Sequence, residues 1–208
     1  MINHNKNTIR DDLQNMFSKA FFENDLDTLK IAYKTLRNFE RENTKDKCLK
    51  LCDIGNFVEG LTVGTDIITE PFFKSFIYCG NEIPNIICNI SMVENAILNL
   101  FSNAYLYGKG RLVTVKTIDR TNFIDICVTS GGAFNFKHNM CSGLDFIRKV
   151  CDFHKGHFLI ESNSLYSNAH ILLPKEFDYA NQKEPLKITD DIILDRLSPL
   201  YVELFGME

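Results

Sequence analysis

The sequence lacks several features that would assign it to a class of protein at once. Basic residues are not in excess, because 23 Lys and Arg stand against 27 Asp and Glu and the formal net charge is −4. Binding to nucleic acid phosphates needs a positive surface, so we expect no nucleic acid partner. No apolar run approaches the roughly 20 residues that cross a membrane, and the first residues carry no hydrophobic signal core. We therefore expect a cytoplasmic protein without a membrane partner.

The chain also lacks paired cysteine motifs and an evident catalytic constellation. It has seven cysteines, an odd number, and none forms a Cys-x-x-Cys pair. Most lie among apolar neighbours, as in Ile86-Ile87-Cys88, which is typical of reduced cysteines in a core. No Ser-His-Asp, Cys-His or paired-carboxylate arrangement stands out, and no partner can be assigned to His138, His157 or His170.

Glycine and proline are absent before Gly55. Apolar residues recur at helical spacing from Ile9 to Phe21 and again over residues 26–39, with a polar break between. Two amphipathic helices joined by a short turn form an antiparallel hairpin, and we expect the second to continue over residues 48–61. Because a two-helix hairpin cannot bury its apolar faces alone, we expect it to pair with a second copy into a dimeric four-helix bundle. The alternative is a helical cap packed on the rest of the chain.

A second helix-forming stretch runs from Glu94 to Tyr107. Its apolar residues lie on one face, and Asn95, Asn99 and Asn103 follow one another at four-residue steps on another face. Amide oxygens can bind a cation and amide donors can bind phosphate oxygens. The alternative is a polar, solvated helix face.

Strands and one further helix surround this stretch. Short strands are predicted at residues 66–69, 76–79 and 86–88. After the helix predicted from Glu94 to Tyr107, here called the asparagine helix, we expect strands at 111–118, 123–129, 158–161 and 169–174, and a helix at 143–153. This order predicts an α/β sandwich with a mixed sheet under a layer of helices. With the helical hairpin in front, the whole chain falls in the α+β class.

The stretch from residue 89 to residue 174 resembles the ATP-binding domain of histidine kinases. Asn99-Leu-Phe-Ser-Asn103-Ala104 resembles the asparagine box of that family, and later landmarks follow in the family's order. These landmarks are Gly143-Leu144, His154-Lys155-Gly156 and Leu172-Leu173-Pro174. The resemblance implies that Asn103 would carry the Mg²⁺ of a bound nucleotide, with Asn99 beside it. It also implies that the hairpin is the family's dimerisation and phosphotransfer domain.

The glycine boxes depart from the family's pattern. The family places an Asp that accepts the adenine amino group before two glycines. Here Ser130 takes the position of the Asp, Gly132 keeps the first glycine and Phe134 replaces the second. A serine hydroxyl is shorter and uncharged, and of the second box only Gly143 is kept. The resemblance therefore implies a vestigial site of Asn99, Asn103, Ser130, Gly132 and Gly143, with no cofactor or with residual Mg-ATP.

The phosphoacceptor also departs from the pattern. The segment from Arg10 to Asn15 resembles the family's acceptor motif with Asp11 in the place of the histidine. His4 lies seven residues earlier, which is nearly the same side of a helix two turns away. His4 is the phosphoacceptor candidate, and a frayed terminal histidine is the alternative.

We therefore predict three parts. Residues 1–62 form the hairpin domain, residues 63–174 a degenerate histidine kinase ATPase-like domain, and residues 175–208 a C-terminal extension that folds back on the protein or binds a partner. The departures resemble those of bacterial histidine phosphotransferases. The resemblance implies a homodimer that exchanges phosphate with response-regulator receiver domains without ATP, and that is an enzyme only if His4 or another histidine accepts phosphate.

Three alternatives stay open. A pseudokinase scaffold would bind receivers or a partner histidine kinase without chemistry. An ATP-dependent histidine kinase would have a divergent pocket. An anti-sigma-like binding module would use the same fold for docking alone.

Overall fold

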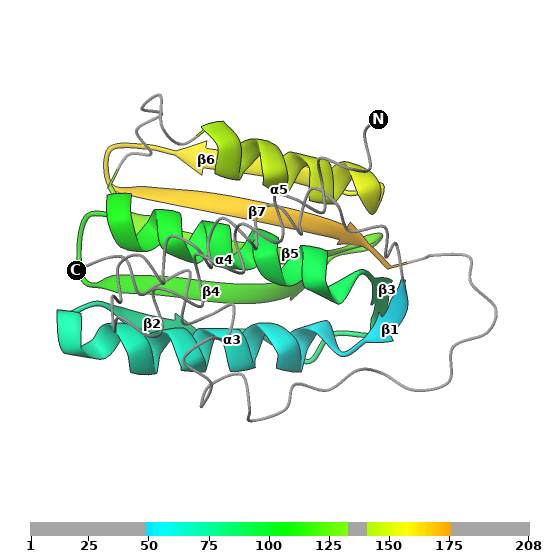
Figure 1. Cartoon of the computed structure of the whole chain (residues 1–208), viewed down its shortest axis with the longest axis horizontal. Helices are drawn as coiled ribbons and strands as arrows, with labels where there is room; N and C mark the ends of the chain where they lie inside the picture. Colours follow the sequence, from blue (N-terminus) through cyan, green and yellow to red (C-terminus); the bar gives the residue numbers. More distant parts are fainter. Residues whose placement is uncertain (1–48, 133–140, 176–208) are drawn as a thin grey trace, which may run out of the picture. The chain divides into compact units, whose positions relative to one another are not determined.

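The computed structural model describes residues 49–132 and 141–175 (Figure 1). The predicted hairpin, His4, Asp11 and the C-terminal extension lie outside the described residues. In chain order the elements are β1 (Lys50–Cys52), α3 (Ile54–Thr69), the 3-10 helix η1 (Glu70–Phe72), β2 (Ser75–Tyr78), β3 (Ile86–Cys88), α4 (Ile90–Tyr107), β4 (Leu112–Asp119), β5 (Phe123–Gly131), α5 (Cys141–Phe153), β6 (His157–Ser162) and β7 (Tyr166–Pro174).

The main sheet has five strands in the order β2-β4-β5-β7-β6. Strand β2 runs parallel to β4, and the other neighbours are antiparallel. Helices α3, α4 and α5 cover one face of this sheet (Figure 1). The predicted layer of helices on a mixed sheet is confirmed for the described residues.

Helix α4 forms where the asparagine stretch predicted it. The side chain of Asn89 caps its first turn by accepting a hydrogen bond from the backbone N–H of Met92 at 3.1 Å. The predicted apolar face is buried, and Phe101 at its centre packs against Phe76 of β2 with ring centroids 5.3 Å apart. Each such large side chain contributes roughly 1.5–3 kcal/mol by burial, so α4 is anchored to the sheet by the face opposite its polar stripe.

The prediction of a continuous helix over residues 48–61 is wrong. Strand β1 pairs antiparallel with β3, whose residues lie more than thirty positions further along the chain. The side chain of Asp53 then accepts from the N–H of Asn56 at 3.1 Å and starts α3. Helix α3 runs across residue 62, at which the sequence analysis divides the chain, and the compact unit containing it begins at Cys48.

The strand predicted at residues 66–69 is also wrong, because these residues belong to α3. The stretch is rich in β-branched residues, which favour strands when tertiary contacts are ignored. In the structure the hydroxyls of Thr62, Thr65 and Thr69 each donate to the carbonyl four residues earlier, at 2.7–2.9 Å. Asp66 links the helix to β2 by accepting from the N–H of Phe76 at 2.7 Å. The buried face of α3 therefore outweighs the strand propensity.

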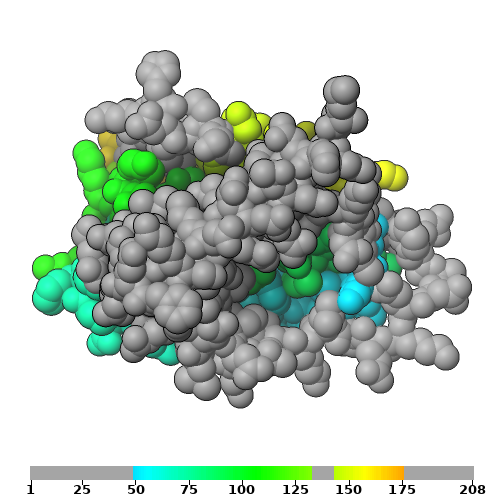
Figure 2. All heavy atoms as spheres, in the orientation of Figure 1, coloured from blue at the N-terminus to red at the C-terminus, as the bar shows by residue number. Residues whose placement is uncertain are grey.

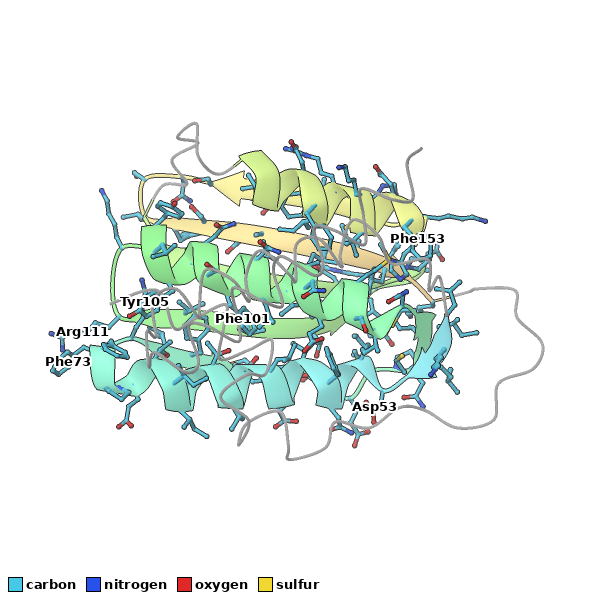
Figure 3. All side chains as sticks on the ribbon, in the orientation of Figure 1. Asp53, Phe73, Phe101, Tyr105, Arg111 and Phe153 are labelled. Carbon is cyan, nitrogen blue, oxygen red and sulfur yellow. The ribbon has the colours of Figure 1, made fainter. Side chains whose placement is uncertain are left out.

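At one end of the domain, α3 and α4 both stop beside the start of β4. The residue after η1, Phe73, is 75% exposed and adopts φ 60°, which is unusual for a bulky residue. The guanidinium of Arg111 lies 5.5 Å from the centroid of its ring, and Figure 3 shows both side chains near Tyr105. The teal atoms at the left edge of Figure 2 belong to this end of α3 and η1.

Candidate functional site

The C-terminal end of α4, which carries Asn99 and Asn103, is fixed by Lys74. The Nζ of Lys74 donates to the carbonyl oxygens of Tyr105 at 2.7 Å and Gly108 at 2.9 Å, and it lies 5.5 Å from the Tyr105 ring centroid. Burial lowers the pKa of Lys74. A cation at a helix C-terminus opposes the negative end of the helix dipole and satisfies carbonyls that the helix leaves free. Lys74 therefore holds the asparagine helix to the start of β2.

Replacing Lys74 with methionine is expected to lower the free energy of unfolding by about 1–3 kcal/mol, because two carbonyls lose a charged donor while the apolar stem is kept. Lys149→Met on the exposed face of α5 is the matched control, and we expect it to change stability by less than about 0.5 kcal/mol. Urea denaturation measures both variants. Equal midpoints for the two would contradict the capping role.

The predicted adenine side of the site is packed by the chain itself. Ser130 on β5 is buried. A Cβ added at Gly108 would lie only 2.9 Å from the Cβ of Ser130, so Ser130 packs directly against the backbone of Gly108. The aliphatic stem of Lys109 lies equally close to Gly132, at 2.9 Å from its ideal Cβ. Gly132 adopts φ 84° and donates its N–H to the carbonyl of Leu165 at 2.7 Å. The glycine-box backbone is thus covered by Lys109 and bonded to the β6–β7 turn.

On the phosphate side, α4 and α5 are in direct contact. The Oδ1 of Asn99 lies 3.1 Å from an ideal Cβ at Gly143, so the start of α5 approaches the asparagine stripe closely. The Nδ2 of Asn99 donates to the carbonyl of Asn95 at 2.7 Å, within the same helix. The amide of Asn99 is therefore used for helix–helix packing and for a bond to its own helix.

Asn103 lies one turn further along α4. Among the described residues, its Nδ2 is the one buried side-chain nitrogen or oxygen that has no hydrogen-bond partner. A buried donor without a partner is unfavourable by about 1–3 kcal/mol. Contacts among the predicted site residues thus join Asn99 to Gly143, while Ser130 and Gly132 lie against Gly108 and Lys109, which follow α4.

Comparisons with solved structures show what this arrangement is similar to. The catalytic domain of histidine kinase ThkA matches with a TM-score of 0.54 at 16% identity, covering 61% of this chain and 95% of that domain. The histidine kinase AdeS of Acinetobacter baumannii matches with a TM-score of 0.56 at 14% identity, covering 84% of this chain and 98% of that one. The described domain has the histidine kinase catalytic fold. At such identities the likeness establishes the fold and leaves activity to be argued from the site.

A further match extends over more of the chain. Full-length ShkA, solved in complex with AMPPNP, matches with a TM-score of 0.70 at 12% identity, and the match covers 86% of this chain but 46% of ShkA. No protein-family model matches the sequence, and no curated protein matches it. In the described part of the chain, no helix is long and apolar enough to cross a bilayer.

His154, one of the landmarks of the kinase catalytic fold, has a structural role here. It is buried at the end of α5, where its Nε2 accepts from the backbone N–H of Asn89 at 2.9 Å and its Nδ1 lies 2.7 Å from the carbonyl of Val150. The bond from Asn89 requires a neutral ring with its proton on Nδ1. Burial lowers the pKa of His154, which favours that neutral form. Both ring nitrogens are therefore engaged: Nδ1 bonds within α5, and Nε2 joins the end of α5 to the start of α4.

A polar cluster on β5 and β7 was not predicted from the sequence. Asp125 is buried and accepts from Arg120 Nη2 at 2.9 Å, while His170 Nδ1 lies 3.0 Å from its Oδ1. The hydrogen bond with Asp125, together with a contact from Cys127, raises the pKa of His170 to about 10. Burial raises the pKa of Asp125, but the bonds from His170 and Arg120 outweigh burial and hold it below its ordinary value.

Part of this cluster could have been predicted, because side chains alternate between the two faces of β5. Asp125 and Cys127 are two residues apart in an otherwise apolar strand, so both lie on the same face of the sheet. The pairing with His170 comes from β7, forty-three residues beyond Cys127, and no local pattern reveals it. The partner that the sequence left unassigned for His170 is Asp125.

Proposed function

We propose that this chain is a two-component signalling protein of the histidine phosphotransferase kind, which exchanges phosphate with response-regulator receiver domains without using ATP. The observation that supports the proposal is that glycines at the nucleotide positions of a kinase catalytic fold are in contact here with the chain's own side chains. Lys109 covers Gly132, Ser130 replaces the adenine-binding Asp, and Asn99 packs against Gly143. A fold that keeps its architecture but lacks the carboxylate that accepts from adenine is suited to docking rather than to ATP chemistry.

Mg-ATP fits these residues poorly. Loss of the carboxylate acceptor at Ser130 leaves the adenine amino group without its partner, which weakens binding by about 1–3 kcal/mol. The N–H of Gly132 donates to the carbonyl of Leu165 and is therefore not available to a ligand. We derive no step of the reaction through a nucleotide.

One observation favours a second candidate, a kinase with residual nucleotide binding. The Nδ2 of Asn103 is buried without a partner, and a phosphate oxygen would supply one. In that case the side-chain oxygen of Asn103 would bind the Mg²⁺. The alternatives of a scaffold and of an anti-sigma-like module rest on no contact within the described residues.

In the proposed transfer, an imidazole nitrogen attacks the phosphorus of a receiver's aspartyl phosphate. An N–P bond forms, the O–P bond breaks, and the receiver's carboxylate leaves; the onward transfer reverses these steps. The acceptor needs an accessible nitrogen, and both nitrogens of the buried His154 are engaged. His4 is the proposed acceptor, and His157, exposed at the start of β6, is the described histidine with which it is best compared.

A phosphotransfer assay tests this assignment. The full-length protein is mixed with a receiver domain carrying radiolabelled phosphate on its aspartate, and acid-labile label on the chain is measured. We expect His4→Ala to lower the label on the order of a hundredfold, because no other nitrogen replaces a lost nucleophile, and His157→Ala to leave it unchanged. Label that survives His4→Ala and disappears with His157→Ala would move the acceptor to β6. No label on the wild-type protein would favour the scaffold.

The proposal includes a homodimer formed through the hairpin. Leu13 and Phe17 lie on its predicted apolar stripe, and two carboxylates in that seam would prevent association. Sedimentation of the full chain as a monomer at micromolar concentration would contradict this part of the proposal.

A further inference from the structure

The polar cluster on β5 and β7 lies at a cross-strand row that joins three strands. In the register of the sheet, Cys127 of β5 is directly opposite Lys116 of β4 and His170 of β7. Directly opposite side chains on one face have Cβ atoms about 4.5–5.5 Å apart. The thiol therefore has a potentially cationic side chain on either side.

The contacts within this row form a chain from carboxylate to imidazole to thiol. His170 Nδ1 lies 3.0 Å from Asp125 Oδ1, and His170 Nε2 lies 3.8 Å from Cys127 Sγ. The carboxylate of Asp125 holds the ring as an imidazolium with a proton on each nitrogen, so Nε2 carries a proton that it can donate beside the sulfur. Thr129 Oγ1 lies 3.8 Å from the same sulfur and donates to Asn168 Oδ1 at 2.9 Å.

The arrangement is unsuited to a metal ion or to acyl transfer. In the described part of the chain, no three His, Cys, Asp or Glu side chains converge in a way that could hold a metal ion. Strand β5 is paired along its whole length with β4 and β7, so its amides serve the ladder and none is free to stabilise an oxyanion. What the row does provide is a thiol in contact with an imidazole that a carboxylate keeps protonated.

We propose that Cys127 is a modification site at which a small hydroperoxide oxidises the thiol to a sulfenic acid, with His170 as the proton carrier. The thiol first loses its proton to water. The sulfur electron pair attacks one peroxide oxygen, an S–O bond forms and the O–O bond breaks. The leaving hydroxide takes the Nε2 proton of the His170 imidazolium and departs as water. Water returns a proton to the imidazole, so one thiol and one hydrogen peroxide give one sulfenic acid and one water.

Access and charge suit a small neutral oxidant. Cys127 is 5% exposed and the His170 side chain 13% exposed, which admits a molecule the size of hydrogen peroxide more readily than a bulky reagent. The charged and titratable groups that face the row are Asp125 on the same strand, Lys116 on β4 and Arg120 in the β4–β5 turn, whose Nη2 bonds Asp125. The residue opposite His170 on β6 is Leu159, so β6 adds no charge there.

The chain carries its own controls for the test. Cys79 is exposed, and Cys151 is buried, where burial raises its pKa to about 12. Full-length protein is treated with hydrogen peroxide at neutral pH and is then unfolded in the presence of a cyclic 1,3-dione, which traps sulfenic acid, and each cysteine peptide is followed by mass spectrometry. We expect Cys127 to be trapped on the order of ten times faster than Cys79 and Cys151.

Two variants test whether the neighbouring side chains, rather than the exposure of Cys127, set its rate of oxidation. His170→Asn removes the proton carrier and is expected to bring the rate at Cys127 down to that of Cys151, while the rate at Cys79 stays unchanged. Lys116→Met is expected to lower the rate at Cys127 by a smaller factor. If the wild-type protein is oxidised at Cys79 before Cys127, or if folded His170→Asn is oxidised at Cys127 as fast as the wild type, the proposal is wrong. If His170→Asn does not fold, the comparison of Cys127 with Cys79 in the wild-type protein still tests the proposal.

Discussion

Replacing Gly156 with alanine is expected to lower the free energy of unfolding by about 3 kcal/mol or more, because a methyl group there overlaps the backbone of the sheet. An ideal Cβ at Gly156 would lie 2.0 Å from the carbonyl oxygen of Leu172 in β7. Neither the backbone at Gly156 nor that of Leu172 can move away to relieve this overlap. The N–H of Gly156 bonds the carbonyl of Cys151 at 2.8 Å, and the next residue, His157, pairs with Leu172.

The control for this prediction is Gly110→Ala. Gly110 adopts φ 98°, so alanine is strained there, yet no atom lies within 4 Å of an ideal Cβ. We expect a loss of roughly 1 kcal/mol from the backbone conformation alone. Urea denaturation followed by circular dichroism compares the two variants. Similar midpoints for Gly156→Ala and Gly110→Ala would show that α5 and β7 do not pack as described.

Replacing Asp125 with alanine is expected to lower the free energy of unfolding by roughly 3 kcal/mol, as breaking a buried ion pair does. The loss leaves His170 without the carboxylate that holds its proton and Arg120 without its partner. Asp145→Ala is the matched control, because Asp145 pairs with Arg148 at 2.8 Å on the exposed side of α5. Such a surface pair contributes about 0–1 kcal/mol.

The same substitution is expected to change how stability depends on pH. The pKa of His170 is raised to about 10 in the folded protein, above the value of about 6.5 for an unfolded histidine. The folded state therefore binds the proton more tightly, and this contribution is complete below pH 6.5 and is lost as the pH rises towards 10. Asp125→Ala should flatten this decline. A wild-type protein whose stability rises from pH 6.5 to pH 9 would contradict the assignment of a charged His170.

His154 contributes in the opposite direction. Because burial lowers its pKa, the unfolded chain binds the proton more tightly below about pH 6.5, and stability falls as the pH decreases through that range. The two histidines together predict a stability maximum near pH 6.5.

Part of this architecture was predictable from local patterns. Helix α4 could be located from the steps of three and four between Val93, Ile97 and Phe101, and its burial follows that pattern. The strands of the main sheet were placed by alternation, and β5 and β7 were extended by a few residues at their ends. These elements carry their own periodicity, so the sequence is informative about them.

Other features depend on distant contacts. Strand β1 forms because it pairs with β3. Helix α3 forms because it packs on β2, although Thr62, Thr65 and Thr69 favour strands; their hydroxyls bond within the helix instead. The same holds for the site. The substitution at Ser130 was visible in the sequence, but the stem of Lys109 over Gly132 was not, because it depends on a four-residue connection that folds back on β5.

The measurement that tests the central claim most directly is calorimetric titration of the full-length protein with Mg-ATP. We predict no saturable heat at nucleotide concentrations up to the millimolar range, since Ser130 replaces the adenine-binding Asp and the stem of Lys109 lies against Gly132. A dissociation constant below roughly 100 μM, equivalent to about −5.5 kcal/mol, that is lost in Asn103→Ala would contradict the account. The chain would then be a nucleotide-binding kinase.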